Sequence, residues 1–428
     1  MNVAVIGGGY AGMAAAATLA ERNVPVTVFE AGKTLGGRAR RVEHRDIPLD
    51  NGLHILIGAY RETLRLMREV GADPDQQLLR LPLTWRIHEQ FSLQAARLPA
   101  PLHLLAGLLT AKGLPWTDRL GAAGFLYRMR RRRFALDADT TVASLLAREA
   151  QGERVNRLLW HPLCVSALNT PPGAASAQVF LNVLRDSLDA GRDAADLLLP
   201  RVDLSSLFPD PAAEYVRRHG GAVLIGQRVT AIDEAAGGFT VTCGGAERSF
   251  SHVVCALPPY HAAAFLLGIS ALADTAEAVE RLSYQPIYSV YLQYPDPVAM
   301  PAAMLGFENA LLQWAFDRGS LAGQRGLIGL VISAEGGHED LTQEALGRLA
   351  HQELQQQLGP LPEPRWCRVI AEKRATFACT PGLRRPETRT ALRNFLLAGD
   401  YVASDYPGTL ESAVRSGINA ANAILGTP

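Results

Sequence analysis

The sequence predicts an α/β protein in which one parallel sheet is assembled from separated stretches of the chain. Three observations carry this expectation. An apolar run at the N-terminus passes through a glycine-rich loop into an alanine-rich stretch, and an apolar run near the C-terminus ends in Gly-Asp. Between these ends lie two long stretches of different character, which we expect to form an inserted mixed sheet plus helices.

Length and composition exclude several classes of protein. The 428 residues are enough for two or three domains, and 48% hydrophobic against 20% charged residues excludes overall disorder. Lys and Arg total 42, as do Asp and Glu, so the net charge of zero weighs against a protein that coats nucleic acid. Five cysteines without a CxxC pair predict reduced thiols and no metal site. With neither a secretory leader nor a membrane span in the sequence, we expect a cytoplasmic protein.

Residues 1–30 predict a strand, a loop, a helix and a second strand in close succession. Residues 3–6 and 25–30 are apolar runs typical of buried parallel strands, and residues 13–22 are rich in helix-forming alanine. The loop before this helix reads Gly-Gly-Gly-Tyr-Ala-Gly. A glycine loop in this context is typical of a Rossmann-like unit, which binds the diphosphate of a dinucleotide at the helix N-terminus.

The glycines of this loop, and the acid that follows, have separate expected roles. Gly7 permits the tight turn, Gly9 lets the backbone approach the diphosphate, and Gly12 lets the helix pack closely on the strand. Glu30 ends the second strand, where a carboxylate can accept hydrogen bonds from the ribose hydroxyls. An acid there disfavours NADP, because it would repel the 2′-phosphate.

A second glycine pair follows the second strand and favours FAD over NAD. Gly36 and Gly37 allow close backbone approach, and Arg38 can offer its planar guanidinium to a diphosphate. A Rossmann-like unit followed by Gly-Gly-Arg resembles the FAD-binding start of the flavin amine oxidase and phytoene desaturase superfamily. The resemblance implies a Rossmann-like FAD-binding domain, and FAD is the cofactor that we expect.

The C-terminal region resembles the closing flavin motif of the same superfamily. Residues 394–400 form an apolar strand that ends in Asp400, and a helix of small residues follows shortly afterwards. The resemblance implies that Asp400 lies near the ribityl-phosphate part of FAD. It also implies that Gly408, Thr409 and Leu410 present helix N–H groups to the isoalloxazine, where they would stabilise negative charge on the reduced flavin.

A third piece, in the middle of the chain, completes the expected FAD domain. The resemblance implies that Val229, after a strand that begins at residue 222, meets the adenine through its backbone. A hairpin over 239–243 and 248–251 leads to a strand that begins at residue 253. We expect an FAD-binding domain from residues 1–62, 206–274 and 371–428, and a substrate-binding domain from residues 63–205 and 275–370.

The two insertions differ in their expected secondary structure. The first looks mainly helical, whereas the second combines strands over 287–292 and 327–332 with a helix over 341–358. Within the first, residues 98–134 join an apolar, Pro-broken helical stretch to five arginines within positions 128–133. This pattern suits a peripheral contact with the inner face of the cell membrane, and it suits a buried helix pair followed by a solvated basic face equally well.

Further motifs resemble one branch of the superfamily, the hydroxysqualene dehydroxylase family. They are Asp-Asn-Gly-Leu-His at 50–54, Asn-Thr-Pro-Pro at 169–172 and Asp-Tyr-Pro at 405–407. Leu53 departs from the family pattern, which has Gln at this position. The resemblance spans nearly the whole chain. It implies that the C30 allylic alcohol hydroxysqualene loses its hydroxyl as water while reduced FAD delivers hydride, giving squalene for hopanoid biosynthesis.

Loss of a hydroxyl needs a proton donor, and a cation-like carbon needs shelter from water. His54 and Asp405 are the candidate catalytic residues, because each lies in a motif expected near the flavin. A histidine bonded to the backbone and an aspartate that caps a turn are the structural alternatives, and both stay open.

Other functions also stay open on the sequence alone. A carotenoid or phytoene-type oxidative desaturase would use the same fold and FAD with the opposite electron flow, and an amine oxidase would share the cofactor. A non-enzymatic relative, like the Rab escort proteins and dissociation inhibitors, would bind prenylated protein without a working flavin site. The nearly complete set of FAD motifs at both ends of the chain favours an enzyme.

Overall fold

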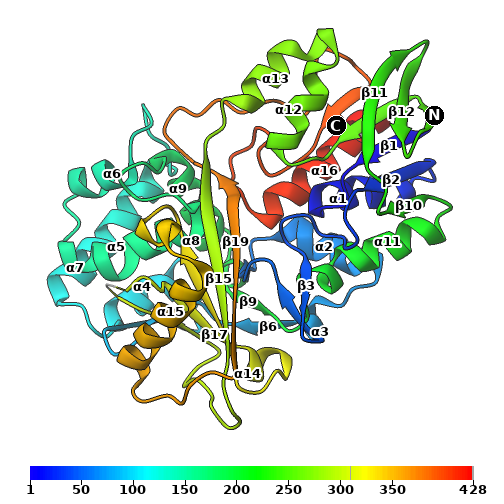
Figure 1. The fold of residues 1–428 in the computed structure, drawn as a ribbon. Helices are drawn as coiled ribbons and strands as arrows, with labels where there is room; N and C mark the ends of the chain where they lie inside the picture. The colour runs from blue at the N-terminus through cyan, green and yellow to red at the C-terminus, as the bar shows by residue number, and fades with distance from the viewer. Residues whose placement is uncertain (309, 427–428) are drawn as a thin grey trace.

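The computed structural model describes residues 1–308 and 310–426, and it contains a five-stranded parallel sheet built from distant parts of the chain (Figure 1). The strand order is β10-β2-β1-β14-β20. In that order the strands are Ala222–Ile225, Val26–Glu30, Val3–Ile6, His252–Cys255 and Phe395–Leu397. Neighbouring strands thus come from the beginning, the middle and the end of the chain, which confirms the predicted α/β class.

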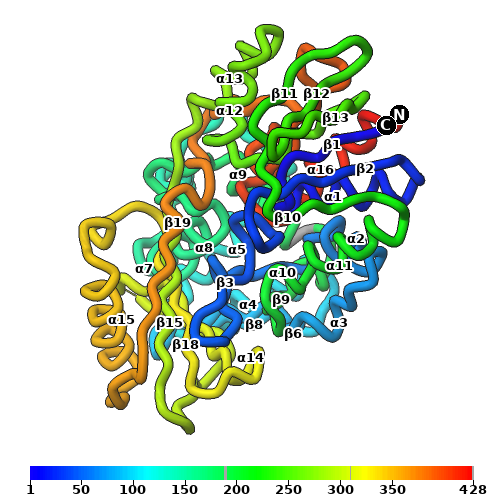
Figure 2. Tube along the Cα trace, turned by 45° about the vertical axis from the view of Figure 1, so that its right-hand side comes forward, coloured from blue at the N-terminus to red at the C-terminus, as the bar shows by residue number. Residues whose placement is uncertain are grey.

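Three helices pack together against one face of this sheet. They are α1 (Tyr10–Glu21), α11 (Pro209–Arg218) and α16 (Leu410–Leu425). Figures 1 and 2 both show α1 and α16 side by side. Small residues make this close packing possible, because a Cβ at Gly417 would lie 2.1 Å from the carbonyl oxygen of Ala11.

An antiparallel sheet and two helices cover the other face. The strands are β11 (Val229–Ala235), β12 (Gly238–Cys243) and β13 (Ala246–Phe250), and the helices are α12 (Pro259–Leu267) and α13 (Ala273–Glu280). Alternate residues of β1 serve the two faces, since Val5 packs with α1 and Ile6 packs with Phe239 of the hairpin side. The hairpin predicted near residues 239–251 is present.

A second, seven-stranded mixed sheet forms the inserted layer. Its order is β19-β15-β18-β17-β16-β7-β8. In that order the strands are Trp366–Phe377, Tyr284–Gln293, Leu327–Ser333, Trp314–Asp317, Met304–Gly306, Thr84–Ile87 and Phe91–Gln94. β15 and β19 run antiparallel as the two long strands at the centre of Figure 1, and α15 (Gln343–Leu358) packs against them.

The first insertion is less helical than its sequence indicates. β7 and β8 join the edge of the seven-stranded sheet, while β9 (Leu197–Pro200) pairs with both β5 (Leu56–Ile57) and β6 (Leu78–Leu81) in a separate sheet. Each of these strands has four residues or fewer. Runs so short show no alternation that distinguishes a strand from a helical segment.

The helices of this insertion gather on the left of Figure 1. They are α4 (Leu102–Thr110), α5 (Trp116–Arg131), α6 (Val142–Arg148), α7 (Glu153–Val155), the π-helical turn η1 (Asn156–Trp160), α8 (His161–Leu168) and α9 (Ala177–Leu184). The remaining elements are β3 (Arg41–His44), β4 (Ile47–Asp50), α2 (Arg61–Val70), α3 (Pro74–Gln77), η2 (Arg185–Asp189), η3 (Arg192–Ala195), α10 (Leu204–Leu207), η4 (Ser270–Leu272), α14 (Arg318–Ala322) and η5 (Gly337–Asp340).

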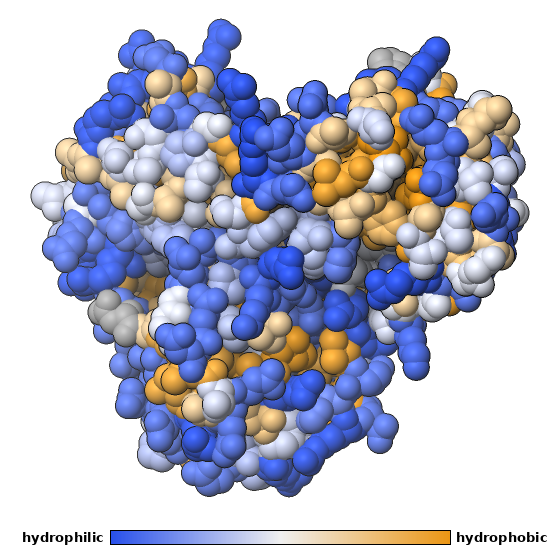
Figure 3. Space-filling view, turned by 45° about the horizontal axis from the view of Figure 1, so that its top comes forward, coloured by the Kyte–Doolittle hydropathy of each residue, from blue (hydrophilic) through white to orange (hydrophobic). Residues whose placement is uncertain are grey.

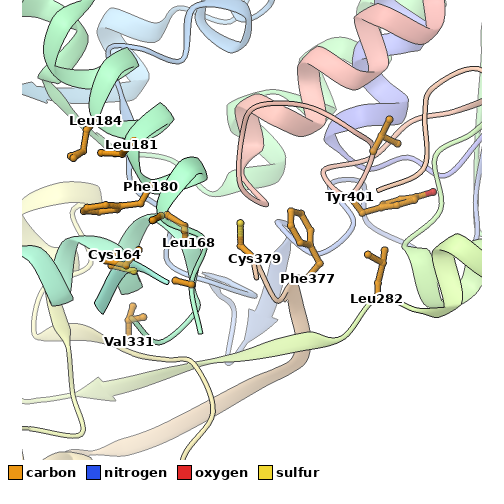
Figure 4. Close-up of a cluster of buried hydrophobic side chains, with 14 of the residues drawn as sticks. Cys164, Leu168, Phe180, Leu181, Leu184, Leu282, Val331, Phe377, Cys379 and Tyr401 are labelled. Atoms are coloured by element: carbon orange, nitrogen blue, oxygen red, sulfur yellow. The ribbon is translucent and has the colours of Figure 1, made fainter. Parts of the chain in front are cut away.

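One hydrophobic core joins the helical part to both sheets. Figure 4 shows part of it, with Phe180 and Cys164 on the helices, Val331 and Phe377 on the seven-stranded sheet, and Tyr401 in the segment after β20. The surface in Figure 3 is mostly polar, with apolar residues gathered in limited areas and a notch at its upper edge. Within residues 1–308 and 310–426, no helix combines the length and the apolar character that crossing a bilayer requires.

Candidate functional site

A pocket of about 760 Å³ is lined by residues of both sheets. On the side of the five-stranded sheet, the lining residues follow the carboxyl ends of β1, β2, β14 and β20, which is where open α/β sheets bind their ligands. On the other side the lining comes from β15, β17, β18 and β19, and from the end of α8. The pocket therefore has a backbone-rich end and a side-chain-rich end.

The three motif glycines lie at one place but are required for different reasons. Gly7 has a φ of +110°, and a Cβ there would lie 2.6 Å from the carbonyl oxygen of Ala256. Gly12 does not line the pocket; its Cβ would lie 1.9 Å from the carbonyl oxygen of Gly7, so it permits the packing of α1. Gly9 has an ordinary φ of −78°, and its nearest neighbours would lie 3.8 Å or more from a Cβ. The fold by itself does not require glycine at position 9, and the open space there suits a ligand.

The Gly36-Gly37 loop lies directly against this first loop. The Gly36 N–H donates to the carbonyl oxygen of Gly8 at 2.9 Å, and a Cβ at Gly37 would lie 3.3 Å from the Cα of Gly9. Gly36 and Gly37 both have positive φ values, +115° and +63°. Together the two loops form a strip of backbone along the pocket wall, as a diphosphate requires.

Glu30 lines the pocket from the end of β2 and connects the loops around it. Its carboxylate accepts the N–H of Gly8 at 2.7 Å and the N–H of Gly32 at 2.6 Å. Val229, the first residue of β11, lines the same end of the pocket. The acid and the Val229 backbone thus lie at the end where the sequence motifs predict the adenosine part of the dinucleotide.

Arg38 and Asp400 meet at the pocket wall. The Arg38 guanidinium donates to the Asp400 carboxylate and, at 2.7 Å, to the carbonyl oxygen of Ala375 on β19. Burial disfavours the charged guanidinium, but the adjacent carboxylate more than compensates and raises the pKa of Arg38. This pair links the N-terminal motif, the C-terminal motif and the seven-stranded sheet.

The N-terminus of α16 opens onto the pocket. Gly408, Thr409 and Leu410 all line it, and Thr409 caps the helix by accepting the N–H of Ser412 at 3.2 Å. Glu411 does not act on its own helix end; its buried carboxylate accepts the N–H of Thr63 at 2.9 Å, at the start of α2. The cap uses the N–H of Ser412, which leaves the N–H groups of Leu410 and Glu411 for a ligand carrying partial negative charge.

The two candidate acids lie in different surroundings. His54 lines the pocket, where burial, and next the charge of Arg38, lower its pKa to about 4, so its imidazole is neutral at neutral pH. Asp405 does not line the pocket. Its side chain is 72% exposed and lies 3.8 Å from Arg185, while its backbone carbonyl accepts the side-chain N–H of Asn182. The structure brings His54 to the site and gives Asp405 the position of a turn residue.

The other end of the pocket has an apolar wall that sequence reasoning did not identify. Its members come from the loop after β4, α8 and three strands: Leu53, Ile55, Val165, Ala167, Ile287, Trp314, Phe316 and Val331. Trp314 and Phe316 alternate along β17, so both point to one side of the strand. Leu53 contacts the position of Gly329, where a Cβ would lie 2.7 Å from its Cδ1. The residue that departs from the family pattern is therefore part of this wall.

The Asn-Thr-Pro-Pro motif holds the wall in place. The Asn169 side chain donates to the Thr376 hydroxyl at 3.0 Å and accepts the N–H of Ala334 at 2.9 Å. The Thr170 hydroxyl accepts the N–H of Cys379 at 3.0 Å. Asn169 has a φ of +46°, a conformation that asparagine tolerates better than most residues. The motif ties the end of α8 to the ends of β18 and β19.

These residues fit a flavin dinucleotide. The strip of glycine backbone, the Arg38 guanidinium and the N-terminus of α16 all favour anionic or polarised groups, and Glu30 can accept from hydroxyls. Across residues 1–308 and 310–426, no cluster of three or more His, Cys, Asp or Glu side chains could hold a metal ion.

Comparison with known proteins agrees with this geometry. Hydroxysqualene dehydroxylase of Sinorhizobium fredii is 27% identical over 439 residues, and the alignment covers 99% of this chain and 98% of that protein. Hydroxysqualene dehydroxylase of Rhodopseudomonas palustris is 29% identical with the same coverage. The 15-cis-phytoene desaturase of Synechococcus elongatus is 24% identical, over 99% of this chain and 96% of that protein.

Solved structures share the fold. An oxidoreductase from Methanosarcina mazei superposes with a TM-score of 0.77 at 15% identity, covering 98% of this chain and 99% of that one. Cyclohexylamine oxidase from Brevibacterium oxydans superposes with a TM-score of 0.70 at 20% identity, covering 99% and 98%. The family of flavin containing amine oxidoreductases matches residues 10–425. The chain therefore belongs to this family, as its terminal motifs predict, and its cofactor is FAD.

Proposed function

We propose that this enzyme removes the hydroxyl group of hydroxysqualene reductively and releases squalene. One observation carries the proposal: the backbone-rich cradle for FAD and the apolar wall around Trp314 line the same pocket. A C30 hydrocarbon chain offers little besides apolar surface for recognition, so it requires such a wall. Two relatives named hydroxysqualene dehydroxylase, aligned over nearly the whole chain, support the choice of substrate.

The proposal assigns a part of the cofactor to each group of motif residues. Gly7, Gly9, Gly36, Gly37 and Arg38 would hold the diphosphate, with Gly12 packing α1 behind them. The ribose would lie at Glu30 and the adenine at the Val229 backbone. A separate set, Asp400, Gly408, Thr409 and Leu410, would hold the ribityl and pyrimidine parts. The FAD-binding and substrate-binding domains, at the boundaries expected from the sequence, belong to the same proposal.

When bound and reduced, FAD supplies the hydride for this reaction. The C–O bond of the alcohol breaks, a C–H bond forms at the same carbon, and the oxygen leaves as water after taking up one proton. The wall formed by Trp314, Phe316 and Val331 excludes water from the cation-like carbon, which would otherwise be captured as the alcohol. His54, neutral in this pocket, can orient the hydroxyl by a hydrogen bond but is a poor source of the proton.

We assign the proton to Glu372. Among the described residues, the carboxyl groups that line the pocket are those of Glu30, Glu372 and Asp400. Backbone N–H groups hold Glu30 and the Arg38 guanidinium holds Asp400, so both are committed to structure. Glu372, on β19, accepts the side-chain N–H of Asn51 at 3.2 Å and faces the same space as His54.

The test is anaerobic incubation of the photoreduced holoenzyme with hydroxysqualene. Squalene should appear in a molar amount equal to the flavin that is reoxidised, and the absorbance band of oxidised flavin should return. Reduced enzyme that leaves hydroxysqualene unchanged would contradict the proposal.

An oxidative desaturase is the second candidate, because the phytoene desaturase relative aligns over 99% of this chain. The same pocket would then accept a longer acyclic polyene, and electrons would flow from the substrate. Oxidised holoenzyme given phytoene and a quinone acceptor separates the two functions. Desaturated product in that assay, with no squalene in the other, would assign the enzyme to the desaturases.

A further inference from the structure

We propose that the outward faces of α4 and α5 dock on the surface of an anionic phospholipid bilayer. This surface, called the α4–α5 face, consists of Leu102 and Leu105 on α4, Trp116, Leu120 and Tyr127 on α5, and Leu98 in the segment just before α4. In the described part of the chain, these are six of the ten exposed large hydrophobic side chains. Apolar exposure is thus concentrated on one element pair, whereas single exposed leucines are ordinarily scattered over a protein surface.

The exposed side chains of α5 form one stripe. Trp116, Leu120 and Tyr127 stand at positions i, i+4 and i+11, which lie within about 40° of one another around a helix. They are 62%, 60% and 62% exposed. The opposite side of the same helix buries Phe125 and Met129 in the core.

Helix α4 repeats this arrangement. Leu102 and Leu105, one turn apart, are 50% and 41% exposed, while Leu104 and Leu108 are buried. Helices α4 and α5 are in contact, so the two stripes belong to one surface. A surface helix normally presents a polar side to water, and helices that are apolar on both sides require a second apolar environment.

The border of the α4–α5 face is strongly basic. Arginines 128 and 130–133 follow Tyr127 directly, and all five are exposed. Arg128 and Arg132 share the Glu149 carboxylate at 2.7 and 2.8 Å, and Arg131 and Arg133 add two further exposed guanidinium groups to the border. The Arg119 guanidinium lies 4.7 Å from the Trp116 ring centre. An apolar face with a tryptophan and a basic border is typical of protein segments that lie in the interface of an anionic membrane.

Charge also favours a bilayer over a second copy of the chain. In a symmetric dimer through this face, each copy would contribute the same basic border, and the two borders would repel. Anionic headgroups complement that border instead.

The position of the α4–α5 face agrees with a lipid-soluble substrate. This argument alone rests on the proposed function. The inward side of α5 and the pocket-lining Trp314 belong to the same hydrophobic core. Trp85 belongs to the same core, with its ring 4.7 Å from the ring of Trp314. A substrate that partitions into lipid would thus be held on the side of the enzyme nearest its pocket wall.

The first experiment measures sedimentation of the holoenzyme with vesicles. Wild type should bind vesicles of phosphatidylcholine with phosphatidylglycerol more tightly than vesicles of phosphatidylcholine alone, and added salt should weaken the difference. The triple variant W116S/L120S/Y127S should bind at least about tenfold more weakly. The control is Leu267→Ser, which removes a leucine of similar exposure, 57%, on α12.

The second experiment tests the basic border. R131E/R133E should reduce binding to the anionic vesicles by about tenfold or more, given roughly tenfold for each one or two membrane-facing arginines. The double variant R248E/R393E changes the net charge equally, at exposed positions away from α5, and should bind as wild type. Equal losses in the two double variants would mean that only net charge matters, which would overturn the docking face.

The third experiment locates the contact. Trp85, Trp160 and Trp314 are buried and Trp366 is half-buried on β19, whereas Trp116 is exposed. Brominated lipid in the vesicles should therefore quench a fraction of the tryptophan emission that is absent from Trp116→Phe, a variant that keeps an apolar ring.

Each remaining outcome decides the proposal independently of the enzyme's substrate. The triple variant should retain FAD as wild type does, which shows that its fold is intact. A triple variant that binds vesicles as tightly as Leu267→Ser refutes the proposal. Loss of a dimer in the triple variant, without loss of vesicle binding, assigns the face to a second copy instead.

Discussion

Arg38 and Asp400 form an ion pair at the cofactor pocket although 362 positions separate them in the sequence. Each belongs to a motif that predicts FAD binding on its own, and the contact between them closes the cofactor cradle. The Asp400 side chain is 8% exposed and that of Arg38 is 22% exposed, so each charge depends on the other for compensation.

We therefore expect Asp400→Asn to weaken FAD binding and the fold together. Loss of the carboxylate leaves the guanidinium without its partner, which costs about 3 kcal/mol in the free energy of unfolding and at least about tenfold in FAD affinity. Denaturant titration and the flavin content of purified protein measure the two effects. Arg348→Gln, in an exposed pair with Glu344, is the control and should change neither. Full flavin content in Asp400→Asn would show that the pair does not hold the cofactor.

Substitutions at Gly9 and Gly12 should separate cofactor binding from folding. A Cβ at Gly9 meets no atom closer than 3.8 Å, so Gly9→Ala should leave the apoprotein within about 1 kcal/mol of wild type but abolish FAD retention. A Cβ at Gly12 would lie 1.9 Å from a carbonyl oxygen, so Gly12→Ala should destabilise the apoprotein by about 3 kcal/mol or more. Thermal unfolding compares the melting temperatures of the two apoproteins. Equal melting temperatures would contradict the different roles of Gly9 and Gly12.

His54 should not produce a break in the pH profile of the enzyme near neutrality. Its pKa is lowered to about 4, so the imidazole stays neutral throughout the usual assay range. Wild type and His54→Gln should therefore show parallel profiles of kcat/KM between about pH 5.5 and 8. A limb near pH 6.5 that is present in wild type and missing from His54→Gln would assign the titrating acid to this histidine.

The variants Glu372→Gln and Asp405→Asn each remove one carboxyl group. Glu372 lies inside the pocket and Asp405 lies outside it. We expect Glu372→Gln to lower kcat by about 100-fold or more, because protonation of the leaving oxygen becomes limiting. Asp405, 72% exposed, should tolerate its amide replacement with unchanged kcat and FAD content. Flavin spectra of both variants ensure that a loss of turnover is not a loss of cofactor. A fully active Glu372→Gln would move the proton donor to water or another group.

Because of Asp50, we expect the free energy of unfolding to decrease as the pH rises from about 4 to about 6. Burial, partly offset by Arg318, raises the pKa of this carboxyl from 3.8 to about 6. Because the folded state prefers the protonated form, the stabilisation is fully present below about pH 4 and is lost as the pH rises through about 6. The loss is about 3 kcal/mol, and Asp50→Asn should remove this part of the pH dependence in denaturant titrations. Asp193→Asn, at an exposed position, should keep the wild-type slope.

The sequence by itself determined the cofactor and the family. Glycine spacing, an acid at the end of β2 and a Gly-Asp ending are local signals, because each motif folds around a few neighbouring residues and a backbone conformation. They therefore identified most residues that line the cofactor end of the pocket, including Arg38 and Thr409.

The tertiary structure decided the substrate end. Trp314 and Phe316 belong to no sequence motif. They line the pocket only because the seven-stranded sheet places their side of β17 against it. His54 and Asp405 look alike as motif residues, yet burial depends on long-range packing, which places one inside the pocket and the other in solvent. The same packing leaves the side chains of the α4–α5 face exposed, which the apolar sequence of these helices does not reveal by itself.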